Sequence, residues 1–98
     1  MEYYTLYENK NGTVGIAIVP YGYKAMIHSH KEDETYVFLE GKGKMLLGND
    51  TIIGEGVVKI PGDTKHAMTP YSERVVLLYI FKKSPFSSII YNYIQSYL

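Results

Sequence analysis

Short runs of alternating apolar and polar residues make up most of the chain, and each run ends near glycine, proline or acidic residues. A period of two indicates half-buried β-strands, because successive side chains of a strand point to opposite faces. Turn-forming sequences separate the runs, such as GND at 48–50 and GDTK at 62–65. Seven or eight short strands with frequent turns are typical of a β-sandwich or barrel. The expected strands cover residues 13–19, 24–30, 34–40, 42–48, 57–61, 66–69 and 73–83.

The C-terminal segment has a different period. Apolar residues recur there at spacings of three and four, which predicts a helix with one apolar face. Ser84 suits the position that caps such a helix, and Pro85 suits its first turn. We therefore expect one all-β domain, with a barrel at about 13–83 and an amphipathic α-helix at about 85–98. The apolar face of this helix would pack either on its own sheet or across a dimer, and the sequence leaves both open.

Composition narrows the function classes. The 98 residues carry ten basic and ten acidic side chains, and Arg74 is the only arginine. This balance argues against a surface for nucleic acid or for an anionic membrane. The absence of cysteine excludes disulfides and thiolate zinc sites. There is no signal-peptide pattern and no apolar run near the roughly 20 residues of a membrane span, so we expect a cytoplasmic protein.

The three histidines all lie near the ends of expected strands. His28 and His30 are two residues apart and therefore share one face of a strand. Glu34 opens the next strand after a polar turn, and His66 opens a later one. Each histidine taken alone is more often a surface or hydrogen-bonded residue. Three imidazoles and a carboxylate that converge in a barrel would instead suit a divalent ion such as zinc, iron, nickel or manganese.

The stretch from Gly22 to Gly41 reads G, five residues, H-x-H, three residues, E, six residues, G. It resembles the first conserved motif of the cupins at every fixed position. The second cupin motif is only partly present. Pro61 and His66 keep its spacing, whereas the positions of its two glycines and its asparagine hold Glu55, Asp63 and Pro70.

This resemblance spans roughly residues 14–83 and implies a cupin-type double-stranded β-helix, a jelly-roll barrel. It also implies that His28, His30, Glu34 and His66 bind one divalent ion, with iron, manganese, nickel and zinc as the candidates. A homodimer is common among cupins and is the expected assembly.

Alternation along the same strands predicts the side chains around this site. Tyr36 stands two residues after Glu34, and its hydroxyl would point toward a metal-bound molecule as a donor or an acid. Glu34 itself would serve as a base if it left the metal. On the longest strand, either of two alternating sets faces inward. The predicted pocket residues are Met26, Tyr36, Phe38 and Met68, and the two alternative sets are Val75, Leu77, Tyr79 and Phe81, or Val76, Leu78 and Ile80.

No basic cluster is expected inside the barrel, which disfavours carboxylate and sugar-phosphate substrates. The resemblance implies dioxygenases, isomerases, decarboxylases, lyases and cyclases. Among these, we expect a dioxygenase-like or isomerase-like enzyme that acts on a small, largely uncharged organic molecule. The alternative is a cupin that binds or senses a small molecule without turnover. A storage role fits less well, because the chain is small and its ligand set is intact.

Overall fold

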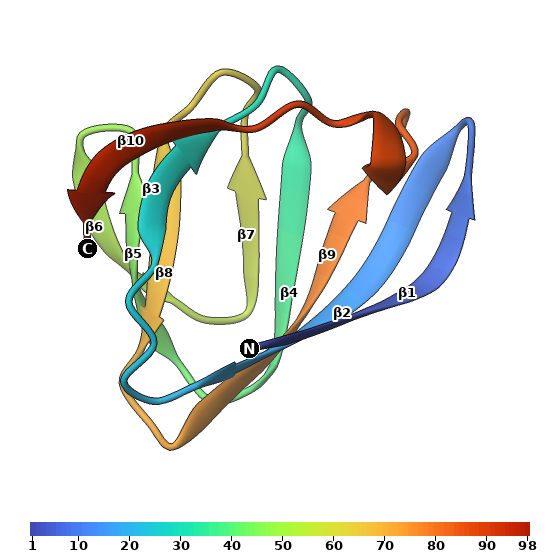
Figure 1. The fold of residues 1–98 in the computed structure, drawn as a ribbon. Helices are drawn as coiled ribbons and strands as arrows, with labels where there is room; N and C mark the ends of the chain where they lie inside the picture. Colours follow the sequence, from blue (N-terminus) through green and yellow to red (C-terminus); the bar gives the residue numbers. More distant parts are fainter.

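The computed structural model describes residues 1–98 as two five-stranded antiparallel sheets that face each other (Figure 1). Their strand orders are β1-β2-β9-β4-β7 and β10-β3-β8-β5-β6. The all-β double-stranded β-helix that the sequence predicts is therefore confirmed. The first sheet contains β1 (Glu2–Asn9), β2 (Gly12–Pro20), β9 (Arg74–Phe81), β4 (Glu34–Glu40) and β7 (Val57–Ile60). The second contains β10 (Asn92–Tyr97), β3 (Met26–Ser29), β8 (His66–Pro70), β5 (Gly43–Leu47) and β6 (Asp50–Gly54).

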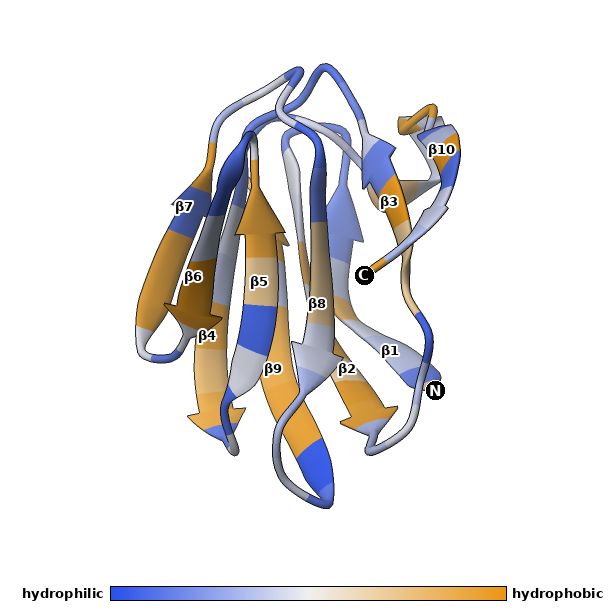
Figure 2. Ribbon diagram, turned by 90° about the vertical axis from the view of Figure 1, so that its left-hand side faces the viewer, coloured by the Kyte–Doolittle hydropathy of each residue, from blue (hydrophilic) through white to orange (hydrophobic).

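The core lies between the sheets and is built mainly from the inward faces of β2, β5, β7, β8 and β9. Figure 2 shows the apolar residues concentrated on the strands and the polar residues in the turns. On β9 the inward set is Val75, Leu77, Tyr79 and Phe81, each at most 4% exposed. The residues between them on β9 are less buried. The face of β9 that points toward the other sheet is therefore the one with Val75, Leu77, Tyr79 and Phe81.

Three strands were not among those expected from the sequence. β6 completes a hairpin with β5 across the turn at Gly48, whose φ of 63° is one that glycine adopts without strain. β1 pairs with the outer edge of β2, and all of its residues are exposed. β10 pairs with β3, and its residues are exposed as well. Exposed strands at a sheet edge carry little of the alternation by which strands are recognised in a sequence.

The predicted C-terminal helix is wrong. A single 3-10 turn, Phe86–Ser88, is followed by extended chain and then by β10. Pro85 is itself extended, with ψ of 145°, and no side chain caps the turn. No helix in the structure has the length and apolar composition that crossing a membrane requires.

Two physical reasons favour the strand. The segment 89–97 is rich in isoleucine and tyrosine, and β-branched and aromatic residues prefer extended backbone. β3 would also have an unpaired backbone edge without β10, which bonds to it from Asn92 to Tyr97 (Figure 1). A helix would have satisfied its own backbone but left that edge open.

Candidate metal centre

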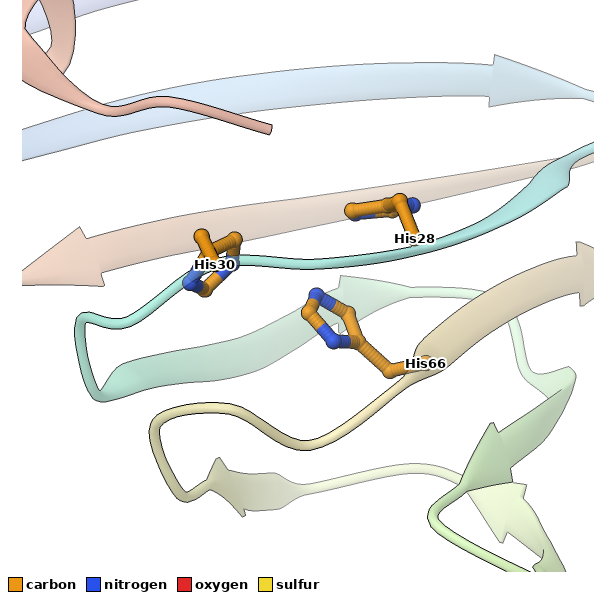
Figure 3. Close-up of side chains that lie close together, drawn as sticks. All are labelled: His28, His30 and His66. Carbon is orange, nitrogen blue, oxygen red and sulfur yellow. The ribbon is translucent and has the colours of Figure 1, made fainter. Parts of the chain in front are cut away.

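The three histidines meet where β3 and β8 lie side by side. His28 and His66 are directly opposite each other in the register of these strands, and His30 follows at the end of β3. One ring nitrogen from each lies within 4.8 Å of the others (Figure 3). His30 and His66 are almost fully buried, and His28 is half-buried. The structure therefore brings together the histidines that the sequence singled out.

Glu34 reaches this group from the opposite sheet. It is the first residue of β4 and is only 6% exposed. Its Oε1 is 3.0 Å from Nε2 of His30 and 3.3 Å from Nε2 of His66. All four predicted ligands thus lie in one cluster, with the carboxylate against two of the imidazoles.

Main-chain carbonyl groups hold the second nitrogen of every ring. In His28, Nδ1 lies 3.2 Å from the carbonyl oxygen of Met26. In His30, Nδ1 lies 2.9 Å from the carbonyl oxygen of Glu32. In His66, Nδ1 lies 2.8 Å from the carbonyl oxygen of Thr64. A carbonyl oxygen only accepts, so Nδ1 carries the proton and donates it in all three rings. Nε2 is then the nitrogen of each ring that remains for a metal, and in His30 it also makes a hydrogen bond of 3.0 Å with Oε1 of Glu34, which a bound ion would replace. Histidines that bind metal ions are commonly oriented in this way.

His66 shows that the cluster fits such an ion. Its Nε2 is buried and has no hydrogen-bond partner, because the contact with Glu34 does not have hydrogen-bond geometry. A buried polar atom without a partner costs about 1–3 kcal/mol. Zinc, iron, nickel and manganese all accept neutral imidazole and carboxylate, and a bound ion would satisfy this nitrogen.

The charge states follow from burial and from the neighbours. Burial alone would raise the pKa of Glu34, but hydrogen bonding to His30 and then the neighbouring His66 hold this pKa below its usual value. Burial opposes the charged form of His30 too, yet the Glu34 carboxylate raises the pKa of His30. Burial, followed by the charge of His66, lowers the pKa of His28. An ionised carboxylate and a neutral His28 are forms that bind metal.

The turn before His66 differs in sequence from the cupin pattern but still holds the site. Asp63 stands where that pattern has glycine, and its φ of 59° is in the left-handed region that glycine and aspartate tolerate best. Its backbone N–H donates to the His30 carbonyl at 2.7 Å. The neighbouring N–H of Gly62 donates to Oδ1 of Asp33 at 2.6 Å. The turn is therefore tied to the loop that carries His30.

A cavity of about 460 Å³ adjoins the cluster and is lined by His28 and Glu34. Three of the four predicted pocket residues line it, namely Met26, Tyr36 and Met68. Phe38 does not. Its ring packs 6.2 Å from that of Tyr36 and against Gly54, because it lies two residues farther along β4 from the site.

Sequence reasoning missed much of the cavity wall. Seven of the eleven tyrosines line it, and most come from segments outside the two cupin motifs. The only signal in the sequence was the high tyrosine content itself. Burial and then the charge of Glu34 raise the pKa of Tyr36 and of Tyr91, so both phenols keep their protons. The seven are Tyr3, Tyr23, Tyr36, Tyr79, Tyr91, Tyr93 and Tyr97, and Lys24 is the one cationic residue of the wall.

No protein-family model matches the chain. An uncharacterised protein of Methanocaldococcus jannaschii, MJ1618, is 36% identical over 64 residues, which are 62% of this chain and 51% of that protein. The chain thus spans about half the length of this curated relative.

Solved structures resemble the chain more completely. A cupin-like protein of Thermotoga maritima has a TM-score of 0.78 at 20% identity, over 96% of this chain and 75% of that one. An RmlC-like cupin family protein of M. jannaschii has a TM-score of 0.76 at 14% identity, over 88% and 83%. The DMSP lyase DddQ of Ruegeria pomeroyi has a TM-score of 0.77 at 21% identity, over 91% and 50%. At these identities the likeness is one of fold, the double-stranded β-helix.

Proposed function

We propose that this small cupin-fold domain binds one divalent metal ion through His28, His30, Glu34 and His66, and that it catalyses a reaction of a small organic molecule in the adjoining cavity. The observation that carries the proposal is the orientation of the three imidazoles. Each donates its Nδ1 proton to a backbone carbonyl, so Nε2 is the nitrogen of each ring that is available to an ion. The group is mostly buried, and His66 has no other partner for that atom.

The ion would supply Lewis-acid chemistry or an activated oxygen ligand when bound. The side chains of the protein would supply the hydrogen-bond donor and the proton acceptor. Tyr36 keeps its proton and lines the same cavity as Glu34, two residues before it on β4, so its hydroxyl would donate to an oxygen atom of the substrate. Glu34 would accept a proton from the substrate if it left the metal.

The lining supports a largely uncharged substrate. Lys24 is the only cation of the wall, so no paired basic groups are present to fix a carboxylate or phosphate. Dioxygenase-like and isomerase-like chemistry both suit such a substrate. The identity of the metal discriminates between them, since iron or nickel favours oxygen chemistry and zinc or manganese favours isomerisation.

The DMSP lyase among the structural neighbours supports an enzymatic role, because there the same fold carries a lyase. The contrasting role is a binding or sensor domain without turnover. A small molecule that raises the melting temperature of the metal-loaded protein and is recovered unchanged would favour that role.

Metal analysis tests the proposal directly. Protein purified without affinity metals is expected to contain, or to take up on reconstitution, one divalent ion per chain. His66→Ala should abolish this binding, and Glu34→Gln should weaken it by at least the roughly 10- to 100-fold that the loss of an outer-shell partner costs. Glu55→Gln is the matched control, because this carboxylate is exposed and pairs only with Lys42. Failure of the wild-type protein to bind any divalent ion would refute the proposal.

A further inference from the structure

The chain between Phe86 and Tyr97, which we call the C-terminal strap, forms one wall of the metal cavity. Four of its residues line that cavity: Phe86, Tyr91, Tyr93 and Tyr97. The strap runs beside β3, the strand that carries His28 (Figure 1). In the register of this pairing, Tyr93 lies directly opposite His28. The strap is therefore a direct neighbour of the histidine cluster and of the cavity.

Tyr91 is the strap residue in contact with two of the histidines. Its ring centroid is 5.5 Å from that of His28 and 5.4 Å from that of His30, and the His30 contact is nearly perpendicular. Tyr93 stacks on Tyr91 at 6.1 Å and also lies 5.7 Å from His28. The Tyr91 ring thus lies beside the histidine cluster and lines the same cavity as Glu34.

Anchors on both sides hold this position. Before Tyr91, Ile89 is buried in the core at 8% exposure, and Phe86 packs against Tyr79 at 5.4 Å. After it, β10 is hydrogen-bonded to β3 from Asn92 onward. Tyr91 is therefore fixed at both ends, although it lies outside the barrel motifs.

We propose that Tyr91 is a positioning residue of this site, whose phenol hydroxyl donates a hydrogen bond to an oxygen atom of the ligand that occupies the cavity. The inference rests on the proposed metal function, because the ligand is taken to bind the metal. It also narrows the ligand class. Tyr36 on β4 and Tyr91 on the strap both line the cavity, so two neutral phenols are available to a ligand with at least two acceptor oxygens. The tyrosine walls suit a planar ring.

A chromophoric catechol provides the test. 4-Nitrocatechol carries two adjacent oxygens on a planar ring, and its visible absorption changes when it binds a metal. Cobalt-loaded wild-type protein, Tyr91→Phe and Tyr71→Phe are titrated with this probe, and the cobalt affinity of each protein is measured separately. Tyr71 is the matched control because it is exposed and does not line the cavity.

Tyr91→Phe is expected to bind cobalt as the wild type does, within about twofold, and to bind 4-nitrocatechol about 5- to 10-fold more weakly, as for the loss of one hydrogen bond. The cobalt affinity of the same sample corrects for any loss of folded protein. Should Tyr91→Phe not load cobalt, Tyr91→Met repeats the comparison with a second residue that lacks the hydroxyl.

The outcomes separate the two proposals. If cobalt binds and Tyr91→Phe holds the probe as tightly as wild type and Tyr71→Phe, the role of Tyr91 is refuted while the metal site stands. If wild-type protein binds no cobalt, iron, nickel, zinc or manganese, the metal function fails and the role of Tyr91 fails with it. A selective loss of probe affinity in the hydroxyl-free variant supports the inference.

Discussion

At the residue scale, the site depends on where each imidazole places its proton. The partners of Nδ1 are carbonyl groups of the main chain, so they are set by the backbone and no side-chain substitution removes them. Among the three histidines, only His66 has an Nε2 that is buried without a hydrogen-bond partner. The metal-free protein therefore carries an unsatisfied group that a bound ion would relieve.

Thermal unfolding should detect the stabilisation that a bound ion gives. A saturating divalent ion should raise the melting temperature of the wild-type protein, because it binds only the folded state. The same ion should leave the melting temperature of His66→Ala nearly unchanged. Differential scanning calorimetry with and without zinc measures both, and an equal rise in the variant would contradict the assigned role of His66.

Asp63 provides a second prediction at this scale. Its left-handed φ costs little for glycine and more for residues with a plain Cβ. Asp63→Gly should therefore leave the free energy of unfolding unchanged or raise it by up to about 1 kcal/mol, and Asp63→Ala should lower it by about 1 kcal/mol. Urea denaturation gives these values, with Asp50→Ala on exposed β6 as the control. An Asp63→Ala variant as stable as wild type would argue against strain at this turn.

The buried phenols predict a loss of stability at alkaline pH. Burial, aided by Glu34, raises the pKa of Tyr36 well above the ordinary value near 10. The unfolded chain then loses this proton near pH 10 while the folded chain keeps it, so stability is full below pH 10 and falls above it. For one such group the loss is about 1.4 kcal/mol at pH 11.

Tyr36→Phe removes the titrating group, so the difference in unfolding free energy between pH 8 and pH 11 should shrink by about that amount, roughly 1.4 kcal/mol. Urea denaturation at the two pH values measures it. Exposed Tyr71→Phe is the control and should keep the wild-type difference. The prediction fails if the two variants show the same pH dependence.

At the element scale, the C-terminal strap is the main departure from the sequence-based picture. A helix with its apolar face inward would bury Ile89 and Ile90 together, because adjacent positions of that face both meet the core. The strap instead buries Ile89 at 8% exposure and leaves Ile90 at 76%. Extended chain sends successive side chains to opposite sides, which accounts for this contrast.

Alanine substitutions at these neighbours test the arrangement. Ile89→Ala should lower the free energy of unfolding by about 2–4 kcal/mol, the usual cost of truncating a buried isoleucine. Ile90→Ala should change it by less than about 0.5 kcal/mol. Chemical denaturation compares the two variants, which differ only in position. Equal losses would indicate that the segment packs as a helix after all.

At the scale of the whole molecule, the exposed edge at β1 suggests an assembly. The C-terminal helix that could have formed a dimer contact is absent from the structure. We still propose a homodimer, but through a different surface. β1 is an edge strand with free backbone groups, and it exposes Tyr4 at 51% and Leu6 at 61%. Proteins usually cover or charge such an edge, and a second copy of the chain would cover it here.

Light scattering coupled to size exclusion tests this assembly. Wild-type protein is expected to elute as a dimer at micromolar concentration, and Leu6→Lys as a monomer with an unchanged circular dichroism spectrum. Ile53→Lys places the same charge on an exposed residue of β6, which is the edge strand of the other sheet, and should stay dimeric. A monomeric wild-type protein would rule out the dimer.

The sequence by itself determined the β-barrel and the identity of the clustered side chains. Strands 26–29, 34–40 and 66–70 could be expected because their alternation is local, and the spacing of His28, His30 and Glu34 follows from two strands and one short turn. The partly degraded second motif still predicted His66, since its position depends on a backbone turn that aspartate can adopt.

Only the structure showed which nitrogen of each histidine faces the cluster, because the backbone conformation places a carbonyl group against the other one. It also decided that the chain after residue 85 is a strap, and that tyrosines far apart in sequence meet in one cavity. The strap depends on pairing between β3 and β10, a contact between residues about 65 positions apart. Local periodicity carries no information on such a contact. The apolar residues after residue 85 have a helical spacing, but the unpaired backbone groups at the edge of β3 favoured a strand there instead.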